Sequence, residues 1–225
     1  MEIGAYAFAG IFGLAAIVAV WNLAYRRSIA QQLEDRGFHT CDADADALER
    51  AWRTATGAGA PEELKIVDCR RRAAGRGHLY HFTVREQSRR NGGDRDSDSL
   101  GASYPAYLLD LRDASWVGRP AVTLHVLPPG SKLLRKLVAG AARLADQRPL
   151  LPIGAHPWSE SIVAAHGDVT GSLDEAMPAS MQEQLAKAGA HGFFTIHIGG
   201  GKAAFAANPA HRDIDMQMTY LNSWV

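Results

Sequence analysis

Two groups of side chains have the types and spacing that nucleophilic or acid–base chemistry needs. Cys69 and His81 lie on strand-like segments 64–70 and 78–84, and a hairpin centred on Gly75 would place the thiol opposite the imidazole. An imidazole beside a thiol favours the nucleophilic thiolate, but we favour the interpretation that Cys69 is a buried structural cysteine. The second group falls within one short segment and comprises His156, Ser159, Glu160, His166 and Asp168. Neither group completes a known catalytic motif.

Cofactor and metal motifs are incomplete in this sequence. The run Gly199–Lys202 resembles part of a phosphate-binding loop, but Ile196 stands where that motif needs its first glycine. Ala203 stands where the motif needs Ser or Thr, so we expect a hairpin turn. The nine histidines include no HExxH spacing, and the two cysteines form no CxxC pair. We therefore predict no cofactor and no metal.

The charge balance argues against a nucleic-acid partner. The chain carries 24 Lys and Arg against 24 Asp and Glu, whereas nucleic-acid-binding proteins usually carry a basic excess. A local cluster, Arg70, Arg71 and Arg72, lies on the first expected hairpin. These arginines could contact anionic lipid or an acidic partner, or form a solvated strand edge.

The first 25 residues have the features of a transmembrane anchor. The 23 residues from Ile3 to Tyr25 include no charged residue or histidine, and as a helix they would span about 34 Å. A buried helix and a cleaved signal peptide are the alternatives, although the basic start of a signal peptide is missing. Small residues at fourfold spacing predict a helix-packing face and hence a membrane-protein partner or homo-oligomer: Ala5, Ala9 and Gly13.

The residues that flank the anchor predict its orientation. Arg26 and Arg27 follow it directly, so the positive-inside rule places the C-terminal side in the cytoplasm of a single-pass inner-membrane protein. Cys41 and Cys69 could instead form a disulfide. A disulfide requires an oxidising compartment and would oppose this orientation.

The remaining chain predicts an α+β domain with a mainly antiparallel sheet and flanking helices. We expect an exit helix, a second helix and a linker in 26–60, and the soluble domain in 61–225. The strand candidates come in runs rather than alternating with single helices. We expect helices at 159–167 and 172–189, and we favour a helix over a strand for 208–225.

A basic amphipathic helix is expected between Pro129 and Pro149. Its apolar face contains Leu133, Leu137, Gly140, Ala141 and Leu144, and the remaining surface contains Lys132, Arg135, Lys136 and Arg143. Such a helix can lie on anionic lipid. Of the two interpretations we favour the other one, a core helix whose basic residues form its solvated outer face.

The layout resembles that of uncharacterised bacterial single-pass membrane-anchored proteins. The resemblance rests on the anchor, the LEDRGF exit helix, and the segments GAHPWSESIVAAHGD and FFTIHIGGGKAAFAA. It implies an accessory or interaction protein of a bacterial inner-membrane assembly, associated with the bilayer and without evident catalysis. The alternatives are a membrane-proximal hydrolase and an anionic-lipid or ligand-binding module.

Overall fold

The computed structural model describes the chain in segments that cover most of its length after residue 26. The described residues are 27–41, 45–56, 63–87, 103–110, 120–128, 130, 132–145, 148–208 and 213–224. The chain divides into two compact units, residues 1–39 and 40–225. The predicted anchor, with Ala5, Ala9, Gly13 and Arg26, lies outside the described residues. Within the described part, no helix has the length and apolar character needed to cross a bilayer.

In the N-terminal unit, residues 27–34 are helical. Gly37 has φ +80°, and the Phe38 N–H donates to the Leu33 carbonyl at 3.0 Å. A left-handed residue that closes the last turn is a common helix end. A helix in this segment that ends at Gly37 is therefore confirmed.

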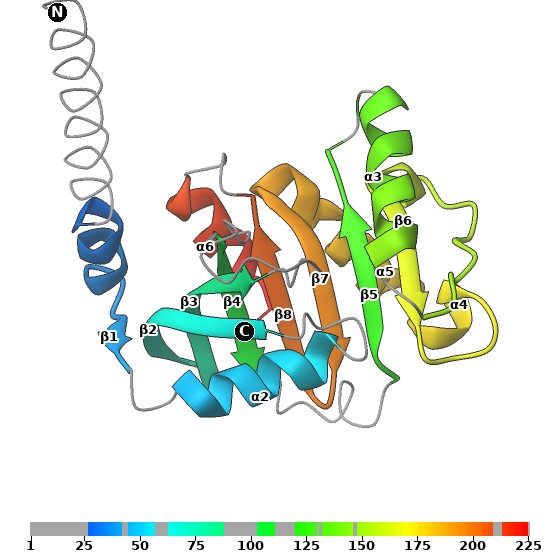
Figure 1. Cartoon of the computed structure of the whole chain (residues 1–225). Coiled ribbons are helices and arrows are strands. Elements are labelled where there is room, and N and C mark those ends of the chain that lie inside the picture. Colours follow the sequence, from blue (N-terminus) through cyan, green and yellow to red (C-terminus); the bar gives the residue numbers. More distant parts are fainter. Residues whose placement is uncertain are drawn as a thin grey trace, which may run out of the picture. The chain divides into compact units, whose positions relative to one another are not determined.

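The chain is α+β, as predicted, and contains one eight-stranded sheet in the order β1-β2-β3-β4-β8-β7-β5-β6 (Figure 1). All neighbouring pairs from β2 to β6 are antiparallel. The strands are β1 (His39–Thr40), β2 (Glu63–Ala74), β3 (Gly77–Gln87), β4 (Ser103–Asp110), β5 (Val122–Val126), β6 (Ile162–Gly167), β7 (Phe193–Gly199) and β8 (Lys202–Ala207).

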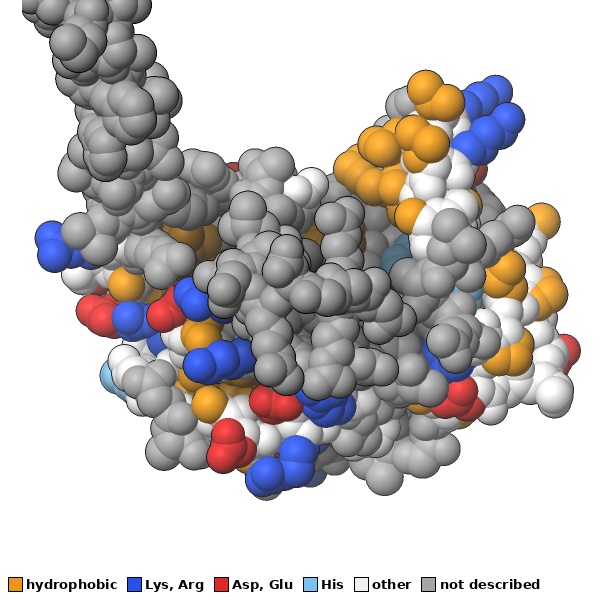
Figure 2. Space-filling model, viewed as in Figure 1, with side chains coloured by type: hydrophobic (Ala, Val, Ile, Leu, Met, Phe, Trp, Pro, Cys, Tyr) orange, Lys and Arg blue, Asp and Glu red, His pale blue; other side chains and the backbone are white. Residues whose placement is uncertain are grey.

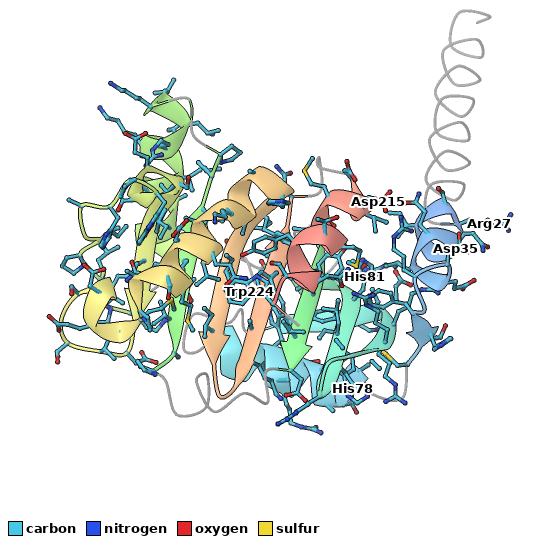
Figure 3. The ribbon with its side chains drawn as sticks, turned by 180° about the vertical axis from the view of Figure 1, so that it is seen from behind. Arg27, Asp35, His78, His81, Asp215 and Trp224 are labelled. Atoms are coloured by element: carbon cyan, nitrogen blue, oxygen red, sulfur yellow. A yellow bond between two sulfur atoms is a disulfide. The ribbon has the colours of Figure 1, made fainter. Side chains whose placement is uncertain are left out.

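Helices cover both faces of this sheet. In Figure 1, α2 lies across the front of the sheet, and α5 and α6 lie behind it; Figure 3 shows those two helices from the other side. The helices are α2 (Ala45–Thr56), α3 (Lys132–Ala145), α4 (Leu173–Ala176), α5 (Ala179–Ala186) and α6 (Ile214–Asn222), with short 3-10 helices η3 (Ser159–Ser161) and η4 (Lys187–His191). The predicted C-terminal helix is confirmed as α6.

Each face of the sheet has its own aromatic packing. On the α2 side, the rings of Trp52 and Phe82 lie 5.4 Å apart. On the other side, the Phe193 ring lies 5.4 Å from that of Phe205 and 5.5 Å from that of Tyr220 on α6. The helix α2 was expected in a segment separate from the 61–225 domain. It packs instead on β2, β7 and β8 because Trp52 completes the front core.

One expected helix is a strand. Residues 162–167, predicted to be helical, form β6, which pairs with β5 from Val122↔Gly167 to Val126↔Ile162. The prediction was wrong because this segment is buried at five of its six positions, and a short apolar run of that kind suits a strand or a helix equally well. The segment predicted as the following helix, 172–189, is divided into α4, α5 and η4, with Pro178 at the start of α5.

Candidate functional site

The helix α3 packs against β6 and β5 at one end of the sheet (Figure 1). Its first turn contains no acidic residue. Among its described side chains, Ala142 is buried, with 3% of its surface exposed. The small Ala142 side chain lets the helix approach the sheet without a large residue between them.

The leucines of α3 face solvent. Leu133 is 70% exposed, Leu134 49% and Leu137 63%, and Figure 2 shows their helix as an apolar projection beside basic side chains. We call these three side chains the leucine face. Gly140 and Ala141, expected on the same face, are exposed too. The favoured interpretation, a core helix with a solvated basic side, is therefore wrong.

The cations of α3 lie on another side of the helix. Lys132, Arg135 and Lys136 line a hollow of about 320 Å³ together with Ala139 and Val163 of β6. The helix thus turns its basic side towards the hollow beside the sheet and its leucines outwards. Lys132 and Lys136 remain exposed, and among the described side chains of α3 only the small Ala142 is buried, so its described leucines are not part of the core.

Exposure of the leucine face to water has a free-energy cost, and a partner that covered this face would remove that cost. Full transfer of a leucine side chain out of water is worth about 1.5–3 kcal/mol. Because the three leucines are half to two thirds exposed in this structure, covering them would contribute about 3–5 kcal/mol in total. Contiguous exposed apolar side chains of this kind mark contact surfaces.

Cys69 and His81 do not meet. Asp68 has φ +56° and forms a bulge, so the β2–β3 register shifts between Val67 and Arg70. His81 therefore pairs with Arg70, and Cys69 joins the core between the sheet and α2. An extra residue in a strand reverses the face of every residue after it. The proposed thiol–imidazole pair is absent for that reason.

Cys69 forms a disulfide with Cys41, with a Cα–Cα distance of 5.4 Å. The Cys41 N–H also donates to the Cys69 carbonyl at 3.0 Å. The disulfide alternative is thus the one that the structure adopts. A sulfur held in a disulfide is not a nucleophile, so Cys69 cannot act as proposed in this state.

His81 is buried on the α6 side of the sheet (Figure 3). Burial, aided by the nearby Arg70 guanidinium, lowers its pKa to about 4. Its ring lies 4.9 Å from that of Tyr107, and its Nδ1 has no hydrogen-bond partner among the described residues. His81 is therefore a neutral core imidazole at physiological pH.

The second predicted group is divided between a loop and the sheet. The Ser159 hydroxyl donates to the Gly154 carbonyl and accepts the His156 backbone N–H, while His156 Nε2 lies 3.0 Å from Asp174 Oδ1. Hydrogen bonds from Gln182 and His156 lower the pKa of Asp174.

Ser159 thus bonds to backbone, and no hydrogen bond to the His156 ring activates it within the described part of the chain. Glu160 and Asp168 are exposed. His166 is buried in β6, where its Nδ1 lies 3.2 Å from the Arg148 carbonyl oxygen. The structure does not bring these five residues together as a catalytic group.

A row of polar side chains on β6, β5 and β7 was not predicted from the sequence. His166, Thr123 and His197 pair side by side, and Thr123 Oγ1 lies 2.8 Å from His197 Nδ1. Arg148 also donates to the Thr123 hydroxyl. Two positions along the same strands, and therefore on the same face of the sheet, Thr195 Oγ1 lies 3.2 Å from His125 Nδ1. Polar residues at every second position of apolar strands, as in TLH and TIH, were the available signal.

The hairpin arginines do not form one patch. Arg71 is exposed, whereas Arg72 donates to Asn222 of α6 and burial lowers its pKa. Arg70 faces His81 on the α6 side. The bulge at Asp68 and strand alternation thus distribute these cations over both faces. Arg27, in the N-terminal unit, is exposed.

Within the described residues, no group of three or more His, Cys, Asp or Glu side chains could hold a metal ion. No protein-family model, curated protein or solved structure matches the chain. The candidate functional site is the leucine face of α3, because its three large apolar side chains are exposed together.

Proposed function

We propose that this protein is a membrane-associated accessory module that docks onto a membrane component through α3. The observation that supports this function most strongly is the exposure of Leu133, Leu134 and Leu137 on one helix. The uncharged run before Arg26 supports the membrane location, and the small-residue spacing within it supports a membrane-protein partner or a homo-oligomer.

The hydrolase alternative has less support. It needs a nucleophile next to a base. Cys69 is held in a disulfide, and the Ser159 hydroxyl is engaged by the backbone of the loop that contains it. Neither side chain is placed for attack on a substrate.

For the side of the membrane, two observations make opposite predictions. Arg26 and Arg27 support a cytoplasmic domain at the inner membrane of a bacterium, and this is the location we propose. The Cys41–Cys69 disulfide supports the oxidising side. A reporter fused after residue 225 separates the two, since a reporter active only outside the cytoplasm overturns the cytoplasmic proposal.

The docking function is tested by photo-crosslinking from α3. A photoreactive side chain replaces Leu137 in the full chain, and intact membranes are irradiated. The control position is Met216 on α6, an exposed apolar side chain away from the leucine face. We expect a discrete adduct with a membrane protein or lipid from Leu137 only. The proposal fails when Leu137 yields neither adduct, or when Met216 yields the same one.

A further inference from the structure

We propose that the partner of the leucine face is an anionic lipid surface, with the axis of α3 in the plane of the membrane. This inference rests on the proposed function, because it names the membrane component onto which the module docks. The chemical class is a bilayer rich in negatively charged phospholipid headgroups.

The shape of α3 fits an interfacial helix. Its 14 residues span about 21 Å, with the leucine face on one side and Lys132, Arg135 and Lys136 on the other. Helices that lie on membranes combine an apolar face of this composition with a Lys- and Arg-rich polar face. Lys132 and Lys136 are exposed although they line the hollow, so their long stems let the charged ends reach headgroups while the leucines enter the acyl boundary.

The charge of α3 selects the headgroups. All ionisable residues from Lys132 to Ala145 are cations, and the first turn has no acidic residue. Three of these cations lie in the N-terminal half of the helix, where the positive end of the helix dipole disfavours them. Anionic headgroups would compensate both the cations and the dipole.

A second copy of this chain fits the leucine face less well. Pairing two such faces would bring two cationic helices together, and like charges at close range oppose association. A protein partner would instead need an apolar groove with an acidic rim, and it becomes an outcome of the test.

The experiment uses the full chain with an environment-sensitive fluorophore on a cysteine that replaces Leu137. Labelling without reductant leaves the native disulfide intact. The protein is reconstituted in vesicles of phosphatidylcholine alone or of phosphatidylcholine with phosphatidylglycerol. Lipid-borne nitroxide reports contact with the bilayer, and aqueous iodide reports exposure to water. A label at Met216 is the matched control.

We expect nitroxide to quench the label at Leu137 in phosphatidylglycerol vesicles while iodide does not reach it. Replacing Lys132, Arg135 and Lys136 with glutamine removes three charges and weakens the contact about 100-fold. High salt weakens it too, because salt screens exposed charges.

Three results overturn the inference. In the first, iodide reaches Leu137 as readily as Met216 in phosphatidylglycerol vesicles. In the second, protection is the same in both kinds of vesicle. In the third, vesicle lipid does not protect the label at Leu137 from iodide, and the photo-crosslinking experiment gives an adduct from Leu137 with a protein only. This third result leaves the docking function intact, whereas the absence of every adduct in the crosslinking experiment ends both proposals.

Discussion

Acid should destabilise the sheet domain through His81. Burial and Arg70 lower its pKa to about 4, against 6.5 for the ordinary side chain. The folded state therefore keeps His81 neutral between these values, while the unfolded chain takes up a proton. Proton uptake by the unfolded state lowers stability as the pH falls through this window.

The magnitude follows from the two pKa values. One pKa unit corresponds to about 1.4 kcal/mol, so the loss from His81 is about 2 kcal/mol at pH 5 and about 3 kcal/mol at pH 4. The loss is near zero above pH 7, where both states are neutral. Because other groups also titrate, the quantity to measure is the difference between the wild type and His81→Leu.

Denaturant unfolding followed by tryptophan fluorescence provides the assay. The unfolding free energy of the wild type should fall relative to His81→Leu between about pH 7 and pH 5, by about 2 kcal/mol. His78→Leu on the same strand controls for loss of a histidine, because His78 is only half-buried. A difference between wild type and His81→Leu that is constant over this range contradicts the burial of a neutral imidazole.

Substitutions at four further positions test the fold. Cys41→Ser should cost about 2–4 kcal/mol under non-reducing conditions and make the mobility of the protein in gels insensitive to reductant, as a chain without the disulfide requires. Purified wild-type protein that still shows two free thiols after oxidation in air would contradict the disulfide. Gly77→Ala should cost about 1–3 kcal/mol, because its Cβ would clash with the Asp110 carbonyl oxygen. Gly140→Ala, in open space on α3, should instead gain about 1 kcal/mol, and thermal melts compare the two. Asp68→Val should lose stability where Asp68→Gly does not, because φ +56° excludes β-branched residues, and equal melting temperatures would refute the role of the bulge.

Local patterns in the sequence predicted many elements of the fold. Gly37 ends a helix, the segments 64–70 and 78–84 pair as β2 and β3, and the chain after Asn208 contains α6. The helix end, the hairpin and the C-terminal helix each depend on residues that are close together in the sequence or are joined by one short turn. The start of α6 was less clear, since its cap is Asp213, which accepts the Met216 N–H.

Local periodicity identified which residues share a face, and the leucines of α3 do share one. It could not say whether that face meets the sheet or solvent, because this depends on how α3 packs on β5 and β6, which pair with each other only in the folded chain. In the same way, one residue in a left-handed conformation, Asp68, reversed the face of Cys69 and separated it from His81. The amino-acid sequence by itself therefore determined the α+β class and the amphipathic character of its helices. Only the tertiary structure decided the disulfide, the burial of His81 and the outward leucine face, because burial arises from long-range packing.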